Sequence, residues 1–158
     1  MSKAPTYSEK DISVLDNPVA LIRKSPNKFV REDPTGAYFA SRLVEDLILL
    51  DVGPLRVARS GSWYSVAADR DWLASASGFV SLEPFVRMIP MPSGGMFYIR
   101  TEVILNALAD AVVTSGIDGI AWISGELTHG MLPNDFDISL SSRKGRIVAF
   151  HFSRSSAA

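Results

Sequence analysis

The pattern of hydrophobic and polar positions predicts two long helices. From Gly36 to Leu50, apolar residues recur every three or four positions, which places them on one face of a helix. These residues are Ala40, Leu43, Val44, Leu47 and Leu50. Thr35 comes directly before the segment, and its hydroxyl can cap the first turn. The second long helix is predicted from Thr101 to Val113, and its apolar residues on most sides are typical of a helix buried between other elements.

Shorter patterns predict one more helix and several strands. Asn17-Pro18 is a good start for a short helix through Arg23 that stops before Pro26. Residues 55–59 and 63–67 alternate around a central glycine and predict a hairpin, and strands are also predicted at 119–124, 136–140 and 147–152. Residues 69–90 give no clear pattern, although 81–85 could open a short helix. The order of elements predicts an α+β fold, a two-layer sandwich of helices on a mixed, mostly antiparallel sheet.

Composition narrows the class of protein. A length of 158 residues is typical of a single domain. The 16 Lys and Arg nearly balance the 17 Asp and Glu, and the net charge of −1 argues against nucleic acid or a membrane as a partner. There is no Cys, which excludes a disulfide framework, a thiolate zinc site and a cysteine nucleophile. Because the first thirty residues contain no apolar run of signal-peptide length and no 18 apolar residues follow one another, we expect a cytoplasmic protein.

Several short segments occur in a recognisable order. They are Tyr7 to Leu15, in which four residues separate Tyr from Ile-Ser-Val-Leu; Ile22 to Pro26; Thr35-Gly36; the predicted hairpin running into Asp69; and Ser93-Gly94-Gly95 followed by Val103 to Leu108. In this order the segments resemble the N-terminal ATPase domain of the DNA gyrase B subunit, and so the GHKL ATPase family. The resemblance covers most of residues 7–114 and the predicted strands in 136–152. It implies a GHKL-like sandwich over residues 18–153, an N-terminal arm over 1–17 and a disordered tail over 154–158.

The residues that hydrolyse ATP in the GHKL family have no counterparts in this chain. The resemblance implies a helix glutamate that activates water and, four residues later, an asparagine that holds magnesium. Registering the helix on Thr35-Gly36 places Leu43 and Leu47 at these positions, and leucine neither accepts a proton nor binds a hard cation. A shifted register that uses Glu45 places Leu49 four residues on, so the pairing still fails.

The family's nucleotide-binding boxes are also degenerate. Asp69 keeps the aspartate of the adenine box, but both glycines are missing and the bulky Trp72 lies there instead. Gly94 and Gly95 match the end of the family's lid, whereas larger side chains at 96–100 replace the glycines that cradle phosphates. Asp69, Gly94 and Gly95 are therefore expected to form a remnant pocket, with no catalytic residue, no metal and no cofactor.

The retained scaffold and the lost motifs predict a catalytically inactive domain that acts through protein contact. In gyrase-like proteins the arm embraces a second protomer, and the apolar side chains of the arm would be exposed on a monomer. These interaction residues are Tyr7, Ile12, Val14 and Leu15. We therefore expect a protein partner, either a second copy bound through the arm or a related ATPase assembly. An arm folded back on its own domain is the alternative.

Two other functions stay open. One is a nucleotide or small-ligand module that binds without hydrolysis. The other is an enzyme of an unrelated class built from Asp135, Asp137 and His151, although acids that serve a turn and a histidine on an exposed strand face are the simpler interpretations.

A polar stripe also marks the second long helix. Glu102, Asn106 and Asp110 lie four residues apart, which is typical of the solvent side of a helix. A ligand or partner site on this stripe is the alternative.

Overall fold

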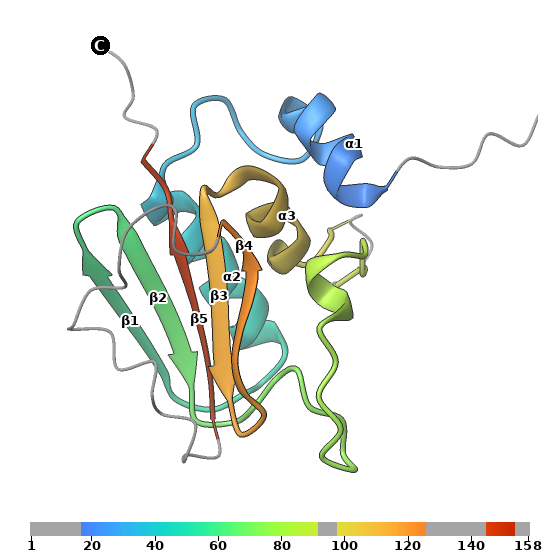
Figure 1. The fold of residues 1–158 in the computed structure, drawn as a ribbon, viewed down its shortest axis with the longest axis vertical. Coiled ribbons are helices and arrows are strands. Elements are labelled where there is room, and N and C mark those ends of the chain that lie inside the picture. The colour runs from blue at the N-terminus through green and yellow to red at the C-terminus, as the bar shows by residue number, and fades with distance from the viewer. Residues whose placement is uncertain (1–16, 92–97, 126–144, 154–158) are drawn as a thin grey trace, which may run out of the picture.

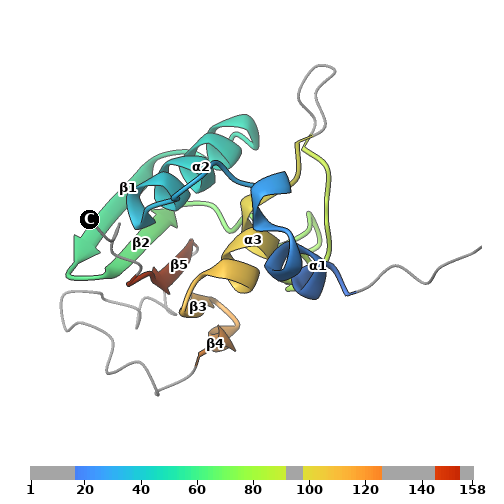
Figure 2. The same cartoon turned by 90° about the horizontal axis from the view of Figure 1, so that it is seen from above.

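A five-stranded sheet carries the fold, and helices cover one of its faces (Figure 1). The computed structural model describes residues 17–91, 98–125 and 145–153. In this part of the chain the strand order is β1-β2-β5-β3-β4, and every pairing is antiparallel. Figure 2 shows the three α-helices on the same side of the sheet. The predicted α+β arrangement of helices on a sheet is therefore present, and its described pairings are antiparallel rather than mixed.

The first helix, α1 (Pro18–Lys24), begins where the sequence predicts. Asn17 Oδ1 accepts a hydrogen bond from Val19 N, and proline occupies the first turn. A short 3-10 helix, η2 (Pro26–Lys28), follows after Ser25. Arg23 extends from α1 and donates from Nε to Ala107 O at 3.0 Å and from Nη2 to Asn106 O at 3.3 Å. Because these carbonyls lie at the C-terminal end of α3, the arginine both caps that helix and joins it to α1.

The long helix α2 (Gly36–Leu49) has the predicted cap and the predicted apolar face. Thr35 Oγ1 accepts a hydrogen bond from Tyr38 N at 3.1 Å. Ala40, Leu43 and Leu47 are buried, whereas Val44 and Leu50 are only partly buried against the core. A β-carbon on Gly36 would overlap the ring of Tyr64, so a larger residue there would have to displace this buried ring.

The prediction of a second long helix from Thr101 to Val113 is wrong. The helix α3 spans Thr101–Leu108, Ala109 is extended, and strand β3 begins at Ala111 and runs to Gly116. Val112, Val113 and Thr114 are β-branched and favour a strand. The apolar residues 111–113 at the start of β3 follow the apolar α3 after a single acidic residue, so periodicity cannot separate this strand from a longer buried helix.

The other strands agree with the sequence where they are described. The predicted hairpin is β1 (Leu55–Ser60) with β2 (Trp63–Ala68), and β4 (Gly119–Ser124) has its predicted bounds. The strand predicted at 147–152 is β5 (Arg146–His151), which lies between β2 and β3. A short 3-10 helix, η3 (Glu83–Phe85), lies within the segment 81–85. The predicted strand at 136–140, the tail 154–158 and all of the predicted arm except Asn17 lie outside the described residues.

Both faces of the central strands are apolar. The face beneath the helices belongs to the main core, which includes Ile22, Phe39, Leu43, Val66, Phe85, Ile104, Val148 and Phe150. On the opposite face, buried side chains form a second cluster of Trp63, Ala67, Ala111, Val113, Ile147 and Ala149, with Trp122 packed against it. Alternate residues of β2, β3 and β5 therefore contribute to different clusters, as the pleat of a sheet requires.

A buried ion-pair cluster joins one end of the sheet to the loop after β2. Arg146 donates to both carboxylate oxygens of Asp71 at 2.9 and 2.7 Å and to Asp118 Oδ1 at 2.7 Å. It also donates to Thr114 Oγ1 at 3.3 Å. The guanidinium is fully buried, so this charge is stabilised only by its partners. Asp71 is therefore a structural residue.

Candidate functional site

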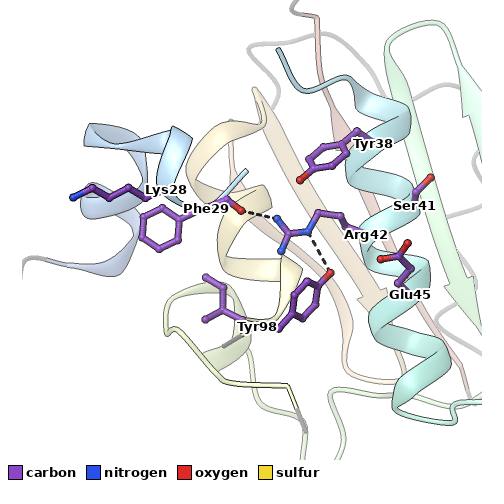
Figure 3. Close-up of a pocket in the computed structure, with 8 residues that line it drawn as sticks. Lys28, Phe29, Tyr38, Ser41, Arg42, Glu45 and Tyr98 are labelled. Carbon is purple, nitrogen blue, oxygen red and sulfur yellow. Dashed lines mark hydrogen bonds between the residues drawn. The ribbon is translucent and has the colours of Figure 1, made fainter. Parts of the chain in front are cut away.

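A pocket of about 570 Å³ opens beside the N-terminal half of α2 (Figure 3). Its walls come from η2 and the residue after it, from α2, and from the two residues at 98 and 99 that precede α3. The lining residues are Lys28, Phe29, Tyr38, Ser41, Arg42, Glu45, Tyr98 and Ile99. Segments far apart in the sequence therefore meet at this pocket.

Arg42 is the central side chain of this pocket. Its Nη1 donates to Phe29 O at 2.8 Å and its Nε donates to Tyr98 Oη at 3.3 Å. The guanidinium also lies 5.0 Å from the ring centre of Tyr98 and 5.9 Å from that of Tyr38 (Figure 3). Tyr38 also favours the charged form of this guanidinium. The arginine is thus held in the pocket wall by Phe29, Tyr98 and Tyr38.

Arg42 stays protonated although the residue is only 8% exposed. Burial on its own lowers the pKa of a guanidinium, but the interactions with the Tyr98 and Tyr38 phenols more than offset this, so the pKa of Arg42 is raised. Burial raises the pKa of Tyr98, which keeps the phenol neutral. The exposed side chains of Lys28 and Glu45 add one charge of each sign to the rim. The pocket therefore contains a fixed cation between aromatic rings.

Asp46 lies one turn after Arg42 on α2 and is 0% exposed. Its Oδ2 accepts a hydrogen bond from Thr101 N, the first residue of α3, at 2.7 Å. Neither Asp46 Oδ1 nor Thr101 Oγ1 has a hydrogen-bond partner within the described residues. Burial raises the pKa of Asp46 to about 6, against the opposing effect of the hydrogen bonding from Thr101. This carboxylate joins α2 to the N-terminus of α3 and so supports the pocket from behind.

Of the remnant nucleotide pocket predicted from Asp69, Gly94 and Gly95, only Asp69 lies in the described part of the chain. Asp69 is exposed and pairs with Arg56 of β1 at 2.6 Å. It does not line the Arg42 pocket. Gly94 and Gly95 lie outside the described residues, so their pocket with Asp69 stays a prediction. The interaction residues Tyr7, Ile12, Val14 and Leu15 lie outside them as well.

The polar stripe predicted on the solvent side of the second long helix is largely buried. Glu102 pairs with Arg100 and accepts a hydrogen bond from Trp72 Nε1 at 3.1 Å. Asn106 Nδ2 donates to Phe85 O at 2.8 Å. The solvent-side interpretation is wrong because α3 packs against α1, α2 and η3 and leaves little of its surface in water.

His151 is partnered by Asp110, which lies in the turn between α3 and β3. His151 Nδ1 lies 3.0 Å from Asp110 Oδ2, and the same oxygen accepts hydrogen bonds from Ser153 N and Oγ. The bonds from Ser153 and His151 outweigh the effect of burial and lower the pKa of Asp110. Asp135 and Asp137 lie outside the described residues, so the catalytic cluster predicted with His151 stays a prediction. Sequence spacing could not indicate the pair, because its members are 41 positions apart.

Within residues 17–91, 98–125 and 145–153, no three His, Asp or Glu side chains gather in a way that could hold a metal ion. None of the helices described for this chain is long and apolar enough to cross a bilayer.

Comparisons with known proteins do not assign the chain to a family. No model of a protein family matches the chain, and no curated protein matches it either. The resemblance to the GHKL family therefore stays a prediction. The geometry of the Arg42 pocket is the observation that bears most directly on function.

Proposed function

We propose that this chain is a non-catalytic binding domain whose Arg42 pocket holds a small anionic ligand. The single observation that carries this proposal is the Arg42 guanidinium, a buried cation in the pocket wall that Phe29 O and Tyr98 Oη hold in place. A guanidinium that is already fixed loses little conformational freedom when it binds an anion. Its hydrogen bonds to a carboxylate or phosphate are also charge-assisted and strong.

The rest of the pocket favours an anion that carries a ring or another flat apolar group. Tyr38, Tyr98 and Phe29 supply aromatic surface on either side of the cation. Lys28 supplies a second positive charge at the rim, while the Glu45 carboxylate can accept a donor from the polar end of the ligand. A volume of about 570 Å³ falls within the range of small-molecule sites.

The described residues around the pocket support binding rather than catalysis. Leu43 and Leu47, which take the positions of the GHKL catalytic pair in the register set by Thr35, are fully buried in the core. Among the eight lining residues, no hydroxyl is hydrogen-bonded to a general base. The protein contact expected from the arm stays a prediction beside this proposal.

Calorimetry on the full chain tests the pocket with matched probes. Benzoate and phenyl phosphate are anions with a ring, benzyl alcohol is neutral, and benzylammonium is a cation. We expect saturable binding of an anionic probe only, weakened at least about tenfold in Arg42→Gln and less in Arg42→Lys. Arg87→Gln is the matched control, because Arg87 is exposed and pairs with Glu83 away from the pocket. Equal affinity in Arg42→Gln and the wild type, or preference for the neutral probe, contradicts the proposal.

Nucleotides are tested in the same way. ATP and ADP are titrated with and without magnesium, and phosphate release is measured over the same interval. We expect no phosphate release above the buffer rate, whether or not a nucleotide binds. Magnesium-dependent release by the wild type that persists through purification would show that the domain is an enzyme.

A further inference from the structure

A second hollow lies on the other side of the exposed ridge of α2. It has a volume of about 550 Å³ and is formed between α2 and strand β1. Ser41 and Glu45 border both this hollow and the Arg42 pocket, so α2 separates the two. We refer to it as the α2–β1 groove.

The walls of the groove are mostly apolar. On the helix side, Ala37, Ala40 and Val44 are spaced three and four residues apart and so form one stripe. Ile48 lies four residues after Val44, continues the same stripe and is 64% exposed. On the strand side, Val57 is 56% exposed and Tyr64 forms the floor. Contiguous exposed apolar surface of this kind, on a helix and a neighbouring strand, is typical of an interaction site.

The strand beside the groove lies at the edge of the sheet. β1 is the outermost strand (Figure 1), and β2 is its only partner strand in the described part of the chain. The N–H and C=O groups on the outer side of residues 55–59 can therefore pair with an added strand. An extended peptide that pairs with β1 would place alternate side chains over the groove.

The residues of β1 define what such a peptide must carry. Leu55 packs with the helix-side core, Val57 lines the groove, and Arg59 lies 5.1 Å from the Tyr64 ring centre, so these three share one face. Arg59 is exposed and held by a bond from Nε to Gly61 O at 3.0 Å. On an antiparallel partner, an acidic residue would lie opposite Arg59, followed two and four positions later by apolar residues opposite Val57 and Leu55.

A second copy of this chain offers Arg59 no acid from its own edge strand, because β1 contains two arginines and no acidic residue. The antiparallel pairing that matches all six residues of two β1 strands also places Arg56 opposite Arg59 twice. Like charges directly opposite one another destabilise a strand pair. Charge complementarity therefore favours an acidic segment over the chain's own edge.

We propose that the α2–β1 groove is a docking site for an extended segment of a partner protein with the pattern acidic-x-apolar-x-apolar, which adds to β1 as an antiparallel strand. The segment pairs its backbone with β1, places its apolar residues against Val57 and the stripe of α2, and pairs its acid with Arg59. This interaction is independent of the ligand proposed for the Arg42 pocket.

Fluorescence polarisation with labelled peptides and the full chain tests the docking site. The probes are a short peptide of this pattern, the same peptide with Lys in place of the acid, and the same peptide with N-methyl groups on alternate amides. We expect the acidic peptide to bind at least about tenfold more tightly than the Lys peptide. N-methylation on the edge that faces β1 should abolish binding, because it removes the donors that pair with the strand.

Variants of the groove test which side chains bind the peptide. Arg59→Glu should reverse the preference between the acidic and Lys peptides, and Val57→Lys should abolish binding of both. Val86→Lys is the matched control for an exposed valine outside the groove, and Arg87→Gln, at an exposed arginine outside it, should leave peptide affinity unchanged. Circular dichroism checks that each variant is folded. The proposal is overturned if no peptide binds the wild type up to about 1 mM, if Arg59→Glu keeps the wild-type preference, or if sedimentation shows that Val57→Lys instead dissolves a homodimer.

Discussion

At the scale of single residues, Asp46 is the most consequential side chain that the hydrophobic pattern does not identify. It is fully buried on α2, accepts its hydrogen bond from Thr101 at the start of α3, and has an elevated pKa of about 6. An elevated carboxyl pKa means that the folded protein binds this proton more tightly than the unfolded chain does. The stability that follows is fully present below the usual pKa of an aspartate and is lost as the pH rises through 6.

Asp46→Asn should therefore change how stability depends on pH. Asparagine keeps an acceptor for Thr101 N and adds a donor that can reach Thr101 Oγ1, which has no partner among the described residues. We expect the variant to gain stability over the wild type above pH 6, by at most about 3 kcal/mol, and the difference to shrink toward pH 4. Urea denaturation across this pH range measures it. The exposed Glu32→Gln is the control, and a constant difference between Asp46→Asn and the wild type would contradict the assigned pKa.

The residues of the pocket show why periodicity alone identified the core but not the site. Leu43 and Leu47 follow the apolar spacing and are buried as expected. Arg42 and Asp46 are charged residues beside the apolar positions of α2, and charged residues in a helix are normally exposed. Both are nevertheless buried. Their burial depends on partners at Phe29, Tyr98 and Thr101, and nothing local in the sequence of α2 indicates those contacts.

At the scale of elements, helix starts were predictable because their caps are local. Asn17 and Thr35 accept the bonds that cap α1 and α2, and both were identified from residue type and position. The end of α3 was not predictable in the same way. No glycine or proline stops it, and the chain passes from Leu108 to β3 through an extended Ala109, so only pairing with β4 and β5 distinguishes strand from helix.

The cap of α2 gives a direct test at this scale. Thr35→Ala removes the acceptor for Tyr38 N and should lower the free energy of unfolding by about 1 kcal/mol. Thr35→Ser keeps the hydroxyl and is the matched control. Urea denaturation compares the two, and equal losses in both variants would mean that the hydroxyl is not the stabilising group.

The buried ion pair at the end of β5 should be more costly to break. Arg146→Met leaves Asp71 without its bidentate partner in a buried position and should destabilise the fold by about 3–5 kcal/mol. Arg56→Met breaks the exposed pair with Asp69 and should cost less than about 1 kcal/mol. The same denaturation measurement covers both variants. Similar losses in the two would contradict the contrast between buried and exposed pairs, and adding Asp71→Leu to Arg146→Met should recover part of the stability.

At the scale of the whole molecule, α2 separates two candidate binding surfaces, one for a small anion and one for an extended segment. The class of fold was predictable, since helices and alternating strands indicated an α+β arrangement. The strand order was not, because β5 lies between β2 and β3 although it is far from β2 in the sequence. Long-range pairing of this kind leaves no local pattern.

The predicted arm carries the remaining test at this scale. If the arm binds a second copy, sedimentation of the full chain should give the mass of a dimer, and replacing the arm's four apolar residues by serine should give the mass of a monomer. These residues are Tyr7, Ile12, Val14 and Leu15. A monomeric wild type would show that the homodimer prediction is wrong.

The central position of β5 also has a consequence for how the chain assembles. The sheet consists of two hairpins, β1-β2 and β3-β4, and β5 is the strand that joins them. During synthesis both hairpins leave the ribosome before β5. The backbone groups of β2 and β3 that pair with β5 therefore have no partner strand until residues 146–151 are made. Folding should therefore be completed late and nearly all at once, and a nascent chain halted before β5 should be degraded rapidly or captured by chaperones.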